Sequence, residues 1–272
     1  MVGIVIAFQD FNPMKGIFQS EFVGWRNFSV LFDSPALGRV VFNTLYLNAL
    51  FLIFDMVFSI AIALFLNEIN SKYYKKLTQS IILLPHFISW TVVAMFANIL
   101  LGSDTGYINI ILKKLNMQPI SFYSTPEVWP PLLTILYVWK NAGFDSIVYL
   151  ATITSIDNEI YEAATIDGTS KIQKIWYITL PLIKNTAILL FLLGVGKIFY
   201  GNFGLIYPLV GSNSLLYPTT DIIDTYIYRA LMELGDMGMS AAVGLSQSVL
   251  GFIIVIITNG IARKFNPESA IF

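Results

Sequence analysis

Hydrogen-bonding and charged side chains interrupt several long apolar stretches of this sequence, and such residues could bind or conduct a polar solute. In the first stretch, Thr44, Asn48, Asp55 and Ser59 are spaced by four, seven and four residues, so a helix would place them on one face. An Asp at the centre of a bilayer costs about 2.5–3.5 kcal/mol on insertion scales, so this face should point away from lipid. It could line a water-filled path, or Asp55 could be buried against a partner helix and accept hydrogen bonds there.

A second group of candidates lies at the start of a later apolar stretch and consists of Tyr137, Trp139, Lys140, Asn141 and Asp145. Aromatic rings stack on the apolar faces of sugars, and amide and ammonium groups bond their hydroxyls. The Tyr and Trp would equally suit the aromatic belt at a membrane interface, without any ligand. The cluster therefore indicates a sugar path or an interfacial anchor.

Lys197 is the third candidate. It belongs to a series of four residues that follow one another at intervals of three, four and three, which predicts that they share one helical face. The series is Gly194, Lys197, Gly201 and Gly204. Small residues at such intervals let helix backbones approach closely, which is the simplest explanation of the stripe. The ammonium has room either to meet a solute or to reach the membrane surface. Together with Lys140, it would attract a sugar that carries carboxylates.

Composition indicates the class of protein that holds these residues. Of 272 residues, 56% are hydrophobic and only 12% are charged, about half the charge of an average soluble domain. We therefore predict one all-α, polytopic membrane domain over residues 1–272, because lipid offers no partner for open backbone groups. Cys is absent and His occurs once, which excludes disulfides, thiolate metal sites and a bis-histidine haem, so no cofactor is expected in this chain. A net charge of -1 offers no basic surface for nucleic acid.

Five apolar windows are long enough to cross a bilayer, which takes about 20 helical residues. Residues 1–8 are apolar but too short to span. We interpret them as the remnant of a sixth, N-terminal helix, the alternative being an amphipathic entry segment. Lysines and arginines gather after the first span, in the loop that follows the third and after the fifth, which predicts that these regions are cytoplasmic. The predicted spans are residues 40–66, 81–101, 131–153, 182–206 and 241–261.

The long polar loop over residues 155–181 has the residues of an organised surface element. Asp157 can cap a short helix, and Glu162 adds the negative charge that a helix N-terminus favours. Ala163 and Ala164 are strong helix formers with almost no side chain, so a partner surface could come close. A simple connection would need neither this length nor these caps.

The second half of this loop predicts a break and a second helix. Asp167 and Gly168 end the first helix, since glycine tolerates positive φ. Thr169 or Ser170 can cap a second helix that runs through Trp176. The predicted result is a helix, a turn and a helix on the cytoplasmic face.

These residues resemble a known family. The pattern Glu-Ala-Ala, three residues, Gly, nine residues, Ile, one residue, Leu-Pro is the EAA motif of binding-protein-dependent ABC importer permeases. Three further stretches, GIVIAFQDFNP at 3–13, FVGWRNF at 22–28 and LPHFISW at 84–90, resemble its LplB-type branch, close to the maltose-type carbohydrate permeases. The motif positions are Glu162, Ala163, Ala164, Gly168, Ile178, Leu180 and Pro181, with Asp167 beside the glycine.

The resemblance implies a type I importer permease fold in the cytoplasmic membrane of a bacterium. It implies a non-catalytic subunit that forms half of the path for an oligosaccharide, neutral or acidic, released from a polysaccharide. The implied partners are a second, homologous permease, an extracytoplasmic solute-binding protein and a cytoplasmic ATPase dimer, which would hold ATP and Mg and dock on the motif loop. Glu162 and Gly168 are the best candidates for coupling to that ATPase.

One alternative is a self-contained secondary transporter in which Asp55 and Lys197 relay ions or protons. Such carriers usually show an internal repeat with interrupted helices. No convincing repeat is present, and the docking loop would be unexplained. The chain also lacks the glycine-rich phosphate loop with its Lys and Ser or Thr, so it should not hydrolyse ATP itself.

Overall fold

The computed structural model describes residues 2–103 and 105–265, and these residues are mostly helical, as predicted. The one sheet among them is an antiparallel pair of short strands with Gln9 opposite Phe22. Met1, part of the predicted N-terminal segment, lies outside the described residues. The elements are α1 (Val2–Ile6), β1 (Gln9–Asp10), α2 (Gly16–Gln19), β2 (Glu21–Phe22), α3 (Arg26–Phe32), α4 (Leu37–Asn67), α5 (Lys72–Phe87), α6 (Trp90–Leu101), α7 (Tyr107–Lys114), the 3₁₀ turns η1 (Phe122–Ser124) and η2 (Pro126–Val128), α8 (Trp129–Thr154), α9 (Asn158–Ile166), α10 (Lys171–Lys174), the π-helical turn η3 (Ile175–Thr179), α11 (Leu180–Val195), α12 (Phe203–Val210), the 3₁₀ turn η4 (Ser214–Leu216), α13 (Tyr217–Thr220), α14 (Ile223–Met232) and α15 (Met237–Phe265).

The chain divides into two compact units, each assembled from three separate segments, and the long helices α4 and α15 contribute to both. The prediction of a single membrane domain stays a prediction. The first unit contains Met1–Ala49, Trp90–Leu133 and Gly196–Ile254, and the second contains Leu50–Ser89, Thr134–Val195 and Val255–Phe272.

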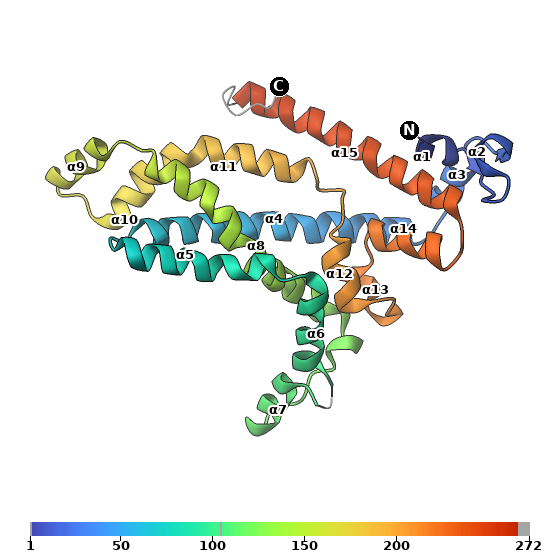
Figure 1. The fold of residues 1–272 in the computed structure, drawn as a ribbon, viewed down its shortest axis with the longest axis horizontal. Coiled ribbons are helices and arrows are strands. Elements are labelled where there is room, and N and C mark those ends of the chain that lie inside the picture. The colour runs from blue at the N-terminus through green and yellow to red at the C-terminus, as the bar shows by residue number, and fades with distance from the viewer. Residues whose placement is uncertain (1, 104, 266–272) are drawn as a thin grey trace. The chain divides into compact units, whose positions relative to one another are not determined.

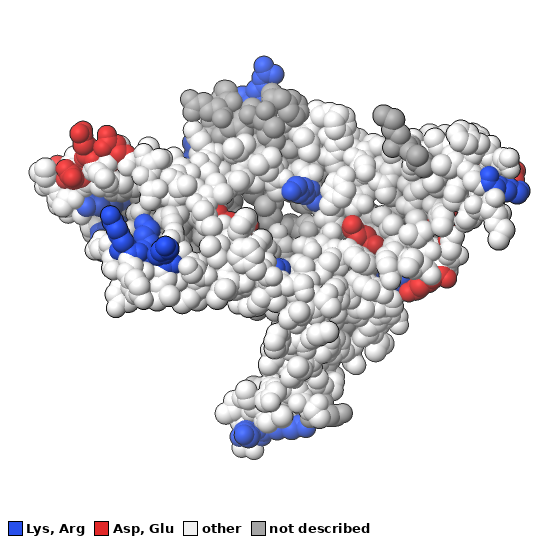
Figure 2. All heavy atoms as spheres, in the orientation of Figure 1, with Lys and Arg blue, Asp and Glu red and all other residues white. Residues whose placement is uncertain are grey.

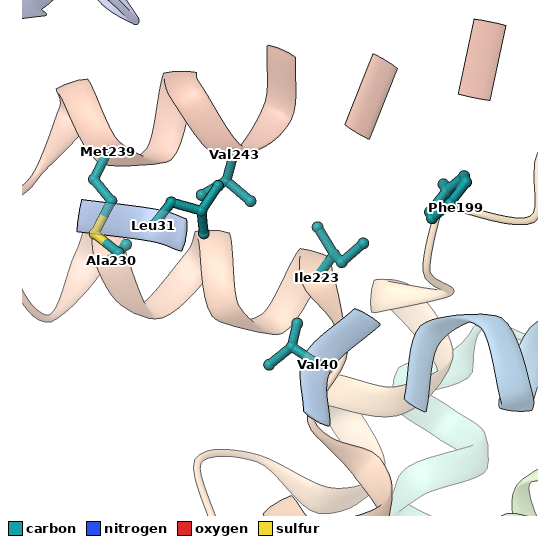
Figure 3. Packing of buried hydrophobic residues seen from close by; sticks show 7 residues of the cluster. All are labelled: Leu31, Val40, Phe199, Ile223, Ala230, Met239 and Val243. Atoms are coloured by element: carbon teal, nitrogen blue, oxygen red, sulfur yellow. The ribbon is translucent and has the colours of Figure 1, made fainter. Parts of the chain in front are cut away.

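The core of the first unit joins segments that are far apart in the sequence. Figure 3 shows its side chains between α14, α15 and the neighbouring elements. All of them are at least nine-tenths buried, so this cluster fixes α14 and α15 against the start of α4. Its members are Leu31, Val40, Phe199, Ile223, Ala230, Met239 and Val243.

The core of the second unit joins α4, α8 and α11. Ala63 and Leu66 on α4 pack with Tyr149 and Ile153 on α8 and with Ile183 on α11. Each of these residues is at most 2% exposed, so the three helices are closely packed at this end of the unit. This core sits beside the loop that follows α8.

Three described helices are long and apolar enough to cross a membrane, and α5 with α6 makes a fourth if the pair is one broken span. The three are Leu37–Asn67, Lys171–Val195 and Met237–Ile261. α8 covers the predicted span 131–153 as one continuous helix, but it is not among these candidates. The structure thus gives a helical, polytopic membrane protein with three or four candidate spans.

The predicted fourth span, residues 182–206, is wrong in its second half. α11 ends at Val195, and the chain is not helical again until Phe203 begins α12. Gly194 and Gly201 therefore do not share one helical face. Glycine is a weak helix former, and polar side chains of α4, α14 and α15 bind the backbone groups of the intervening segment. Hydrophobicity along the chain could not reveal these distant partners.

Candidate functional site

The first half of the predicted loop folds as expected. Asp157 caps α9, where its Oδ1 accepts a hydrogen bond of 3.0 Å from the N–H of Glu159. α9 ends at Ile166, and Gly168 follows with φ of +76°, a conformation that glycine adopts without strain. The cap and the turn are both confirmed.

One face of α9 is open to solvent. Glu162 and Ala163 are exposed, whereas Ala164 on the opposite face is only 8% exposed. α9 and α10 lie at the end of the second unit where α4 ends and α5 begins (Figure 1). Acidic side chains gather over α9 and basic side chains gather beside them (Figure 2). The exposed surface of α9 thus carries an acidic side chain, a small alanine and the apolar side chain of Ile166, which is 86% exposed.

The second half of the loop differs from the prediction. Ser170 and Gln173 form a capping box, so Ser170 is the cap. The helix does not stop at Trp176: it continues through the π-helical turn η3 into α11, as one helix from Lys171 to Val195. Pro181 lies near the start of α11, where it has no N–H to donate. The preceding π turn keeps the helix continuous around this gap in the hydrogen bonding.

Side-chain contacts tie the loop to the helices of the second unit. The hydroxyl groups of Tyr161 on α9 and Thr179 on η3 are 2.9 Å apart, and Thr179 is buried. Lys171 Nζ lies 2.7 Å from Glu68 Oε2, just after the end of α4. A cavity of about 480 Å³ lies between these elements. The loop is therefore connected to both α4 and α11.

Lys140, predicted as a solute contact, binds the backbone in this structure. Its ammonium donates to the carbonyl oxygens of Pro85 (3.3 Å), His86 (2.5 Å) and Ile88 (2.6 Å), and the residue is 7% exposed. These carbonyls lie in the last turn of α5 and just after it. A cation at this end of a helix is favourable, because the helix dipole places negative charge there.

The other predicted solute contacts on α8, Tyr137, Trp139 and Asn141, differ in their contacts and exposure. The ring of Tyr137 stacks on Phe51 of α4, with centroids 4.6 Å apart. Asn141 donates to the Tyr137 carbonyl, 3.0 Å away on its own helix. Trp139 is 47% exposed. Only Trp139 among these three has a largely exposed side chain.

The polar face of α4 points into protein, as predicted. Thr44 accepts a hydrogen bond from the N–H of Ile223, and Ser59 donates to the Ala142 carbonyl. Asp55 is 9% exposed, and its Oδ1 has no hydrogen-bond partner among the described residues.

Two polar candidates belong to the first unit. Asn48 donates to backbone carbonyls of the non-helical segment between α11 and α12. Lys197, on that segment, is exposed. The structure thus places Tyr137, Trp139, Lys140, Asn141 and Asp55 in one unit, and Asn48 and Lys197 in the other.

Comparison with known proteins identifies the family. The profile described as "Binding-protein-dependent transport system inner membrane component" matches residues 36–267. The chain belongs to this family. The permease is 38% identical over 268 residues to Protein LplB of Bacillus subtilis, covering 98% of this chain and 84% of the relative. It is equally identical over the same length to the polygalacturonan/rhamnogalacturonan transport system permease protein YteP of that organism, covering 98% and 83%.

Solved structures resemble the permease throughout its length. One is a bacterial ABC transporter involved in the import of the acidic polysaccharide alginate, with a TM-score of 0.88, 36% identity and coverage of 98% of this chain and 89% of the other. Another is a bacterial alginate ABC transporter in complex with a periplasmic protein that holds an alginate pentasaccharide, with a TM-score of 0.83, 37% identity and coverage of 89% and 83%. The permease is thus a non-catalytic, multi-pass subunit of a bacterial inner-membrane importer.

The structure also shows a contact that sequence reasoning missed. The carboxyl groups of Asp55 on α4 and Asp145 on α8 lie close enough for each to affect the charge of the other. No local spacing could reveal this pair, because the two residues are far apart in the sequence and meet only when the helices pack. Among the described residues, no group of three or more His, Cys, Asp and Glu side chains could hold a metal ion.

Proposed function

We propose that this permease forms half of the path by which an ABC importer carries oligosaccharides derived from polysaccharides. These oligosaccharides include acidic ones. A second, homologous permease completes the path, an extracytoplasmic binding protein delivers the solute, and an ATPase dimer with ATP and Mg drives the cycle. The polygalacturonan, rhamnogalacturonan and alginate named for its relatives and structural neighbours support this substrate class.

The observation that carries the proposal is the build of the loop over residues 155–181. Its first helix exposes Glu162 and Ala163, ends just before Gly168 and contacts Thr179 of η3 through Tyr161. Because η3 continues into α11, a partner that moves this helix would act on α11. The ATPase-coupling residues in this proposal are Glu162, Ala163, Ala164, Asp167, Gly168, Ile178, Leu180 and Pro181.

We also assign five membrane crossings, one each to α4, the pair α5 and α6, α8, α11 and α15. α8 corresponds to the predicted span 131–153, although it is not among the three helices that are long and apolar enough by themselves. Its 26 residues would extend about 39 Å as a helix, which exceeds the roughly 30 Å of a bilayer core. Lys140, its buried cation, binds three carbonyls and does not face lipid.

Among the solute-path candidates, exposure favours Trp139 in the second unit and, separately, Lys197 in the first unit for direct contact. A ring and an ammonium suit the apolar face of a sugar and its carboxylates or hydroxyls. Tyr137, Asn141 and Asp55 lie deeper in the second unit and would shape the path.

Because the chain contains no Cys, single cysteines can test the orientation of the loop. In Ala163→Cys, a membrane-impermeant maleimide should label inside-out vesicles but not intact spheroplasts, and bound ATPase should slow the labelling. Phe18→Cys is the matched control, since Phe18 is fully exposed and precedes the first predicted span, whose other end is predicted to be cytoplasmic. Labelling of Ala163→Cys from outside, or purification of a transport-competent complex without an ATPase, would contradict the proposal.

A further inference from the structure

The segment of residues 196–202, between α11 and α12, is not helical, although it lies within a long apolar stretch that was predicted to be one helix. Asn48 on α4 holds its first part. Its side-chain amide donates to the carbonyl oxygens of Ile198 (2.8 Å) and Tyr200 (3.1 Å). Carbonyl groups outside a helix need other hydrogen-bond partners, and the Asn48 amide supplies them here.

Two residues from other helices hold the rest of the segment. The amide of Gln247 on α15 donates to the Phe199 carbonyl at 2.6 Å, and the Gly201 N–H donates to Oδ2 of Asp224 on α14 at 2.6 Å. Gln247 also donates to that same Oδ2 at 3.1 Å, so the two side chains form one network.

The fit around this network is close. Gln247 is only 5% exposed. A Cβ atom at Gly201 would overlap the side chain of Ile222 and lie 2.6 Å from Asp224 Oδ2, so glycine is needed for the backbone to reach the carboxylate. Polar side chains from three helices thus converge on four successive residues. In an ordinary surface turn, the corresponding backbone N–H and carbonyl groups would form hydrogen bonds with water.

We infer that Asn48, Asp224 and Gln247 are positioning residues that keep residues 196–202 out of the helix, so that Lys197 is presented to the solute. This inference rests on the proposed function. Asn48, predicted above as a solute contact, would act through the backbone instead. Interrupted helices often form the solute sites of membrane transporters, because they free polar groups within the span. The expected ligand of Lys197 is a carboxylate or hydroxyl of a sugar.

Hydrogen exchange on the reconstituted complex tests the holding role without any solute. In Gln247→Leu and Asp224→Leu, amide exchange over residues 196–202 should be at least tenfold faster, while exchange in α9 should stay unchanged. Asp224→Asn keeps an oxygen that can accept from Gly201, so its exchange should stay within threefold of the native rate. Ser246→Ala is the matched control, because Ser246 donates only to Ala242 of its own helix. Unchanged exchange in both leucine variants would overturn the inference.

Uptake in proteoliposomes tests the link to solute, with labelled trigalacturonate as the acidic probe and maltotriose as the neutral one. The leucine variants should raise KM for a transported probe at least fivefold and leave the maximal rate within twofold. Faster exchange with an unchanged KM would overturn the presentation of Lys197. If the leucine variants do not assemble, Gln247→Asn, which shortens the reach of the amide, and Asn48→Ala take their place. If the native complex carries neither probe, the substrate assignment fails, while the exchange result still decides the holding role.

Discussion

Replacing Lys140 by Met should destabilise the second unit by removing the cation that caps the end of α5. The ammonium donates to the carbonyls of His86 and Ile88 at 2.5 and 2.6 Å, and more weakly to Pro85 at 3.3 Å. A buried acceptor left without its partner costs about 1–3 kcal/mol, so two lost short bonds give about 2–6 kcal/mol. For a protein of this size, that corresponds to a fall in Tm of about 4 °C or more.

The assay is thermal unfolding of the detergent-solubilised complex, followed by fluorescence-detected size exclusion. Lys197→Met is the matched control, since it removes the same charge from an exposed side chain. Lys140→Arg should recover part of the loss because a guanidinium can still donate to carbonyls. Equal Tm values for the two methionine variants would refute the capping role.

Uptake measurements can distinguish whether Lys140 caps α5 or binds the solute. If Lys140 acts only as a cap, its replacement by Met should reduce uptake of acidic and neutral oligosaccharides by the same factor. A selective loss of acidic uptake in Lys140→Met would show that this ammonium meets the solute, and would refute the reasoning above. For Lys197→Met, we expect the selective loss.

Three further substitutions test other parts of the structure. Gly168→Val should raise the number of ATP molecules hydrolysed per solute carried, because a side chain at φ of +76° costs about 1–2 kcal/mol. Gly168→Asn should stay near the native ratio, and equal ratios in the two variants would contradict this prediction. Asp221→Asn should lower the stability of the first unit by about 3–5 kcal/mol in thermal unfolding. It removes the carboxylate that lies 2.7 Å from the largely buried guanidinium of Arg229. A loss of stability below about 1 kcal/mol would argue against a stabilising ion pair. Gly143→Val should reduce the yield of folded complex, because a Cβ there would overlap both the side chain and the backbone carbonyl of Ile82. Ile82→Ala should not restore the yield, since it leaves that carbonyl in place; full rescue would contradict the backbone overlap.

The sequence determined the elements whose causes are local. Apolar length predicted the long helices α4 and α15, and the cap residue Asp157 with the glycine at 168 predicted both ends of α9 to within a residue or two. The spacing of Thr44, Asn48 and Asp55 predicted the face of α4 that turns into protein. The cap and turn of α9 act within one helix, and the polar spacing of α4 repeats along one helix, so both patterns can be recognised in a short stretch of sequence.

The tertiary structure alone decided what the polar side chains in the apolar stretches bind. Lys140 and Asn48 looked like solute ligands, but each donates to carbonyls of a distant segment. α11 stops at Val195 because side chains from other helices accept or donate in place of the next helical turn. A hydrogen bond between residues far apart in the sequence has no local spacing to mark it, so the composition of a stretch cannot predict where its polar groups find partners.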